Sequence, residues 1–195
     1  MITSILRSLL FSLTLIAFIA SCSKPKVIKD LKGESYQLVN SDSARVNFPT
    51  DYKGDVVAVT FIYTHCPDIC PLITSNLSNI QDKLQDTSGI DFVEISFDPR
   101  RDTPSVLKKY KKLYGLNDQF SLLTGDTTNI NKLMNRLDIV TQVTYPDSTD
   151  TTSNNYFFTH TNRLYLMDRQ GRMRYQYPAS AVQPQTVVSD LNTIR

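Results

Sequence analysis

The chain has few residues that could take part in metal binding or redox chemistry. Its 195 residues include only three cysteines and two histidines. So few cysteines exclude a framework of several structural disulfides, which is typical of short exported chains. They also leave little for structural zinc, which normally takes four protein ligands. The chemistry of the protein must therefore depend on a very small set of side chains.

The chain also lacks an excess of charge of either sign. It contains 21 Lys and Arg against 19 Asp and Glu, a formal net charge of +2. This near balance excludes a strongly basic surface, so we expect no nucleic-acid partner. No internal repeat is visible. A hydrophobic content of 41% suits one globular domain with a sizeable core.

No hydrophobic run is long enough to span a membrane comfortably, which takes about 20 residues. The run over residues 8–20 follows the charged Arg7 and is typical of the apolar part of an export signal. The sequence "IASC", at 19–22, resembles the lipobox of bacterial lipoproteins, which implies cleavage before Cys22 and lipid attachment to it. We therefore predict a signal peptide over 1–21. The mature protein would be exported and lipid-anchored to a bacterial membrane, with its domain facing the periplasm or the cell exterior.

The residues after Cys22 are polar and rich in lysine ("SKPKVIKDLKGE", 23–34). Such a composition favours a flexible tether that lifts a domain away from a membrane. We predict a tether over 22–36 and a single folded domain over 37–195.

Strand and helix patterns alternate along that domain. "DVVAVTFIY" at 55–63 is a continuous apolar run, as expected for a central strand covered on both faces. The other expected strands are 90–97, 120–125 and a hairpin over 163–177, and the expected helices are 71–84, 104–114, 127–137 and 184–194. This order predicts an α/β fold: a central mixed β-sheet flanked by helices, parallel in its centre and ending in an antiparallel hairpin.

The motif "THCPDICP" places Cys66 and Cys70 between the first central strand and the helix expected from Pro71. If Cys22 carries lipid, these two residues are the only thiols of the domain. A disulfide between them would close a very small loop and add little stability. At a helix N-terminus, free amides and the helix dipole favour thiolates, so we expect both thiol pKa values to lie below the usual value of about 8.5.

Two thiolates separated by three residues do not have the CxxC spacing of thioredoxin-type exchange, but they can bind an ion together. Soft thiolate sites favour Cu(I). His65 lies next to Cys66 and should point elsewhere, which leaves a three-ligand site of Cys66, Cys70 and His160. Thiol-disulfide exchange through a Cys66–Cys70 disulfide remains an alternative, as do peroxidase chemistry and two cysteines that are merely buried.

Three blocks carry a family resemblance: "FIYTHCPDICP", "SFDPRRDTPSVLKKY" and "HTNRLYLMDRQG". In their order and spacing, from about residue 38 to the C-terminus, the chain resembles the Sco/SenC family of thioredoxin-fold copper proteins. The resemblance implies a thioredoxin-like fold and copper bound by Cys66, Cys70 and His160. It also implies that Asp98 lies behind these ligands, where it could orient one of them.

The resemblance further implies a membrane-tethered copper chaperone that assists assembly of the dinuclear copper centre of cytochrome c oxidase. Its partner would be the copper-site subunit of that oxidase or another copper protein. The cargo would be Cu(I), and binding of Cu(II) as well is left open. The competing hypothesis is an enzyme, a thiol-disulfide reductase that keeps the cysteines of a copper-site client reduced. His160 separates the two, because only copper binding requires it.

Overall fold

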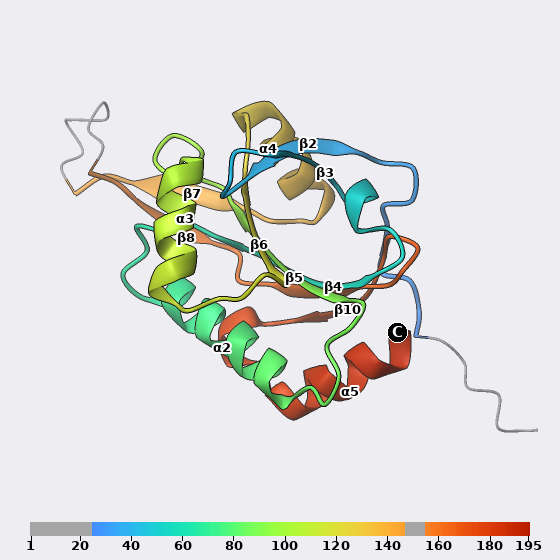
Figure 1. The fold of residues 1–195 in the computed structure, drawn as a ribbon. Helices are drawn as coiled ribbons and strands as arrows, with labels where there is room; N and C mark the ends of the chain where they lie inside the picture. The colour runs from blue at the N-terminus through green and yellow to red at the C-terminus, as the bar shows by residue number, and fades with distance from the viewer. Residues whose placement is uncertain (1–24, 147–154) are drawn as a thin grey trace, which may run out of the picture.

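The structure is a computed structural model that describes residues 25–146 and 155–195. An eight-stranded mixed sheet forms its centre, with the strand order β1-β10-β9-β4-β5-β6-β2-β3 (Figure 1). These strands are β1 (Lys29–Asp30), β2 (Tyr36–Asn40), β3 (Arg45–Phe48), β4 (Val56–Ile62), β5 (Ile90–Ser96), β6 (Phe120–Thr124), β9 (Leu164–Met167) and β10 (Arg172–Tyr177). A separate two-stranded sheet contains β7 (Thr141–Thr144) and β8 (Phe157–His160).

The centre of the main sheet is parallel, as predicted. β4 pairs with β5 and β5 pairs with β6, both in parallel. Every residue of β4 is buried, which is why its sequence is apolar without alternation. The β9–β10 hairpin adds to β4 in the antiparallel sense, and Gly171 takes a positive φ of 82° in its turn. The predicted α/β fold, with helices flanking a mixed sheet, is confirmed.

Helices cover both faces of the sheet. They are α2 (Ile69–Lys83), α3 (Pro104–Leu113), α4 (Thr127–Arg136) and α5 (Pro184–Ile194). Two short 3-10 turns, Thr50–Tyr52 and Ala179–Ala181, lie before β4 and before α5. α2 and α5 pack together on one face, and α4 lies on the other, next to β2 (Figure 1). None of the helices within residues 25–146 and 155–195 combines the length and apolar character needed to cross a bilayer.

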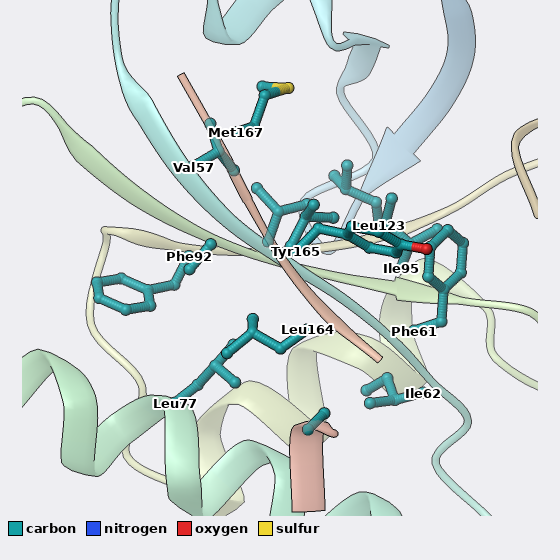
Figure 2. Close-up of a cluster of buried hydrophobic side chains, with 14 of the residues drawn as sticks. Val57, Phe61, Ile62, Leu77, Phe92, Ile95, Leu123, Leu164, Tyr165 and Met167 are labelled. Atoms are coloured by element: carbon teal, nitrogen blue, oxygen red, sulfur yellow. The ribbon is translucent and has the colours of Figure 1, made fainter. Parts of the chain in front are cut away.

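The core lies between the sheet and these helices. Figure 2 shows Leu77 of α2 reaching toward Leu164 of β9, while Ile95 and Leu123 lie on the opposite side of the sheet. All four side chains are fully buried. The spacing of four, three and four residues between Ile73, Leu77, Ile80 and Leu84, from which a helix was predicted, thus corresponds to the buried side of α2.

Helix α2 begins two residues earlier than predicted. We expected it to start at about Pro71, because a proline inside a helix loses a backbone hydrogen bond. The helix starts at Ile69, so Pro71 is its third residue. The first four amides of a helix have no partner within it, so proline costs no hydrogen bond at this position. Cys70 consequently lies in the first turn of α2 and not in the loop before it.

Residues 25–36, the described part of the predicted tether, contact the folded domain. The predicted signal peptide and Cys22 lie outside the described residues. Within the tether predicted over 22–36, Lys29 and Asp30 form β1, which pairs with β10. Leu31 is fully buried, and the Arg174 guanidinium donates to the backbone carbonyl of Pro25. The polar composition of this segment gave no sign of these contacts, because an edge strand needs few apolar residues.

Candidate metal centre

The two motif cysteines lie where β4 leaves the sheet and α2 begins. Tyr63 follows β4 and is buried, and the Cys66 amide donates to its carbonyl oxygen at 3.3 Å. This tight turn points the chain toward the N-terminus of α2. Cys66 is partly exposed and Cys70 is fully buried, and both are free thiols. The loop therefore presents one sulfur to the surface and holds the other beneath it.

Cys66 is the more acidic of the two thiols. Hydrogen bonds from the Cys70 side chain, then from His160 and from the amides of Cys70 and Asp68, lower the pKa of Cys66 to about 3. The amide of Cys70, in the first turn of α2, donates to Cys66 Sγ at 3.4 Å. The sulfur thus serves as the acceptor that a capping side chain would otherwise supply. Cys66 is a thiolate at neutral pH.

Cys70 behaves in the opposite way, so the prediction that both thiol pKa values are lowered is wrong for this residue. Its hydrogen bond to Cys66 and its burial raise the pKa of Cys70, and they outweigh the Tyr63 amide that donates to its sulfur at 3.5 Å. Two sulfurs this close do not both become charged without a cation between them. The pair therefore holds one thiolate and one thiol.

His160 approaches the cysteines from the second sheet. It is the last residue of β8, and its Nε2 lies 3.7 Å from Cys70 Sγ. Its Nδ1 donates to the carbonyl oxygen of Thr161 at 3.0 Å, which fixes the proton on Nδ1. Nε2 is therefore the ring nitrogen that faces the sulfurs. The rings of Phe97 and Tyr63, with centroids 4.9 and 6.1 Å from that of the imidazole, hold it in this orientation.

The structure brings together the three residues that the sequence predicted as metal ligands. The sulfurs of Cys66 and Cys70 and a ring nitrogen of His160 all lie within 4.8 Å of one another. Two sulfurs and one imidazole form a soft donor set of three, which fits Cu(I) better than structural zinc with its four ligands. The chemistry of these residues thus fits copper.

A surface cavity of about 290 Å³ gives access to the cluster. Its walls include Cys66 and His160, together with Tyr63, Pro67, Asp68, Ile69, Phe157, Phe158 and Thr159. Phe157 is 40% exposed at its edge. Most of the lining is apolar and none of it is cationic. An incoming group would meet the Cys66 sulfur and the His160 ring first, since Cys70 is not among the lining residues.

The second histidine of the chain lies outside the cluster. The Nδ1 of His65 lies 3.1 Å from the Thr64 hydroxyl and 3.8 Å from a carboxylate oxygen of Asp102, and half of its side chain is exposed. It packs at the end of the strand beside Cys66, where we expected it.

Asp98, which was expected behind the ligands, contacts residues that position β8 and not the ligands themselves. Its carboxylate accepts from Arg101 Nε at 2.5 Å and from the Tyr156 hydroxyl at 2.6 Å. None of its hydrogen bonds within the described residues reaches Cys66, Cys70 or His160. Arg101 also donates to the Tyr156 carbonyl at 2.8 Å. Asp98 therefore fixes the chain just before β8, and it influences His160 through the position of that strand.

Sequence reasoning missed Asp102, which organises the cysteine loop. This fully buried carboxylate accepts from the amide and the hydroxyl of Thr64, at 3.0 and 2.5 Å, and from the Ser96 hydroxyl at 2.5 Å. It thereby ties the residue two before Cys66 to the end of β5. Asp102 belongs to the same "SFDPRRDTPSVLKKY" block as Asp98, but the sequence alone assigned no role to it.

An α/β fold with a thiolate, a thiol and an imidazole around one opening defines a thioredoxin-like protein with a soft metal-binding site. The comparisons with known proteins agree with this class. The SCO1/SenC family model matches residues 26–195, and the chain belongs to that family.

The relatives support this membership. An SCO2-like protein of Rickettsia typhi is 32% identical over 142 residues, which cover 72% of this chain and 66% of the relative, so the chain spans about two thirds of that protein. ScoI of Bradyrhizobium japonicum, solved with copper bound, is 28% identical with a TM-score of 0.67, over 84% of this chain and 99% of the other. A SCO1/SenC family lipoprotein of Bacillus anthracis is 25% identical with a TM-score of 0.73, over 88% and 99%. The predicted thioredoxin-like fold is thereby confirmed.

Proposed function

We propose that the protein binds Cu(I) through Cys66, Cys70 and His160 and delivers it to a client copper protein. The observation that carries the proposal is the convergence of these three donor atoms within 4.8 Å beside an open cavity. The related ScoI of Bradyrhizobium japonicum is described with copper bound, which supports the same cargo here.

The geometry suits a carrier of copper better than a permanent copper centre. Three protein ligands leave the ion open to a further donor, and the cavity exposes Cys66 and His160 on the side from which a donor would come. A client thiolate entering the cavity could bind the ion before Cys66 leaves it. Copper would then pass by ligand exchange, with no change in its oxidation state.

The client we propose is the protein that carries the dinuclear copper centre of cytochrome c oxidase. The support is membership of the SCO1/SenC family, whose resemblance led us to expect this role. The apolar cavity lining, without cationic residues, is compatible with a cysteine-bearing segment of another protein. We further propose that lipid on Cys22 holds the protein at a bacterial membrane. The description of the Bacillus anthracis relative as a lipoprotein supports that anchor.

One observation favours a second function, thiol-disulfide exchange with the cysteines of such a client. Cys66 is a partly exposed thiolate with a pKa of about 3, and the protonated Cys70 lies beside it. A thiolate that attacks and a neighbouring thiol that resolves are the two groups this chemistry needs. Both functions use the same cysteines, but only copper binding needs His160 as a ligand.

Titration of the reduced protein with Cu(I), against a competing chelator and without oxygen, tests the proposal. We expect one equivalent of copper per wild-type chain. His160→Ala should weaken binding by at least about tenfold, because loss of a ligand costs more than loss of a supporting group. His65→Ala is the matched control and should bind as the wild type does. Equal affinities of His160→Ala and the wild type would refute the three-ligand site, and retained thiol exchange in His160→Ala would separate the two functions.

A further inference from the structure

Tyr63 joins the cysteine loop to the strand that carries His160. It follows β4, and its side chain is almost fully buried. Its main chain contacts both cysteines: its amide donates to Cys70 Sγ at 3.5 Å, and its carbonyl oxygen accepts from the Cys66 amide at 3.3 Å. Its side chain reaches the other half of the site, where its hydroxyl accepts from the backbone amide of Phe158 in β8 at 3.2 Å. One residue thus contacts both parts of the metal centre.

The strand that carries His160 is not a member of the main sheet. Among the described strands, β8 pairs with β7 alone, so the hydrogen bonds of the main sheet do not fix its distance from the cysteines. Phe158 precedes His160 by two residues, and residues two apart in a strand point to the same face. The rings of Phe158 and Tyr63 pack edge to face with their centroids 5.2 Å apart. The position of Phe158 against Tyr63 therefore determines where His160 lies.

The contact between Tyr63 and Phe158 does not involve any of the three ligand atoms. Another hydrogen bond between β8 and the cysteine loop joins His160 Nε2 and Cys70 Sγ, at 3.7 Å. Copper bound by these two atoms would replace it. The hydrogen bond from the Phe158 amide to the Tyr63 hydroxyl uses neither a sulfur nor an imidazole nitrogen, so it can hold β8 in place both before and after the metal binds.

We propose that Tyr63 is a positioning residue for Cu(I) binding, whose hydroxyl holds β8 where His160 can bind the ion together with the two sulfurs. The inference rests on the proposed binding of Cu(I). Ligands that already lie in place lose less conformational freedom when the ion binds. Groups that orient metal ligands in this way typically contribute about tenfold or more to metal affinity.

Replacing Tyr63 by phenylalanine tests this role, because Tyr63→Phe removes the hydroxyl and leaves the ring and the main-chain contacts with the cysteines. In titrations of the reduced proteins with Cu(I), against a competing chelator and without oxygen, the variant should bind about tenfold more weakly than the wild type. Tyr165→Phe is the matched control. Tyr165 is fully buried and its hydroxyl donates to the Leu137 carbonyl at 2.6 Å, away from the three ligands. This control also loses a buried hydrogen bond, but it should bind copper as the wild type does.

A second titration shows whether Tyr63 acts through His160. In a His160→Ala background, adding Tyr63→Phe should weaken Cu(I) binding by less than about twofold, because the ligand that Tyr63 positions is already absent. A further loss of about tenfold in that background would mean that the hydroxyl supports the cysteines or the fold in general, and it would overturn the inference.

Hydrogen exchange in the metal-free protein gives a readout that does not depend on copper. The Phe158 amide should exchange at least about tenfold faster in Tyr63→Phe than in the wild type and Tyr165→Phe, because its acceptor is lost. Equal exchange rates of this amide, or equal Cu(I) affinities of Tyr63→Phe and the wild type, would overturn the positioning role and leave the copper site intact. A wild type that bound no Cu(I) would instead overturn the proposed function, and the role of Tyr63 in copper binding with it.

Discussion

Replacing Glu94 by glutamine should change how the stability of the metal-free protein depends on pH. The pKa of Glu94 rises from an ordinary value of 4.5 to about 8 in the folded state. The folded protein therefore holds this proton more tightly than the unfolded chain does. Its contribution to stability is fully present below about pH 4.5 and is lost as the pH rises to about 8.

The magnitude follows from the difference between the two pKa values. Each pKa unit corresponds to about 1.4 kcal/mol, so the free energy of unfolding falls by at most about 5 kcal/mol across this window. Glu94 is fully buried, so solvent screening does not reduce the value, but local rearrangement around an ionised group does. We expect a loss of about 2 to 5 kcal/mol in the wild type that Glu94→Gln does not show.

Urea denaturation of the reduced, metal-free proteins at several pH values between 5 and 9 measures this difference. Any cost of burying the glutamine amide is the same at every pH, so only the divergence between the two curves counts. Asp91→Asn, on the same strand, serves as the control: burial raises the pKa of Asp91 only to about 6, so the stability curve of the variant should run parallel to that of the wild type above about pH 7. Parallel curves for wild type and Glu94→Gln from pH 5 to 9 would show that burial does not raise the pKa of Glu94.

Two further predictions concern the cysteine loop. Alkylation of the reduced protein at pH 6, mapped by mass spectrometry, should modify Cys66 at least about tenfold faster than Cys70, because Cys66 is a partly exposed thiolate and Cys70 a buried thiol; equal rates would contradict the assigned charges. Asp102→Asn should lower the free energy of unfolding by about 1 to 3 kcal/mol in urea, since an amide group would replace an acceptor of three hydrogen bonds. Asp118→Asn, at an exposed carboxylate, should change it by less than about 0.5 kcal/mol, and equal losses would contradict the role of Asp102.

The sequence predicted those helices and strands in which the apolar residues follow one clear pattern. The continuous apolar run of β4 and the helical stripe of α2 are visible because both faces of the sheet are covered. The strands β1, β2, β3, β7 and β8 were not predicted. β1 and β3 are the edge strands of the main sheet, β2 lies next to β3, and β7 and β8 form the two-stranded sheet. All five are only partly buried, so polar and apolar residues mix in them without a clear period.

The candidate site was also predicted only in part. The residue types and the motif spacing were enough to predict Cys66, Cys70 and His160 as a group. They could not predict that Cys66 and Cys70 would have opposite pKa shifts, because that depends on which sulfur is buried. Glu94 was also invisible, since an acid inside an apolar strand pattern becomes unusual only once helices cover both faces of the sheet.

We propose that two sulfurs and one imidazole hold copper in this protein. X-ray absorption spectroscopy of the Cu(I)-loaded wild type and of His160→Ala tests it most directly, because it identifies the atoms bound to the metal. We expect two sulfur ligands and one imidazole nitrogen in the wild type, with the nitrogen lost in His160→Ala. A wild-type spectrum with one sulfur or none, or a nitrogen ligand that persists in His160→Ala, would contradict it.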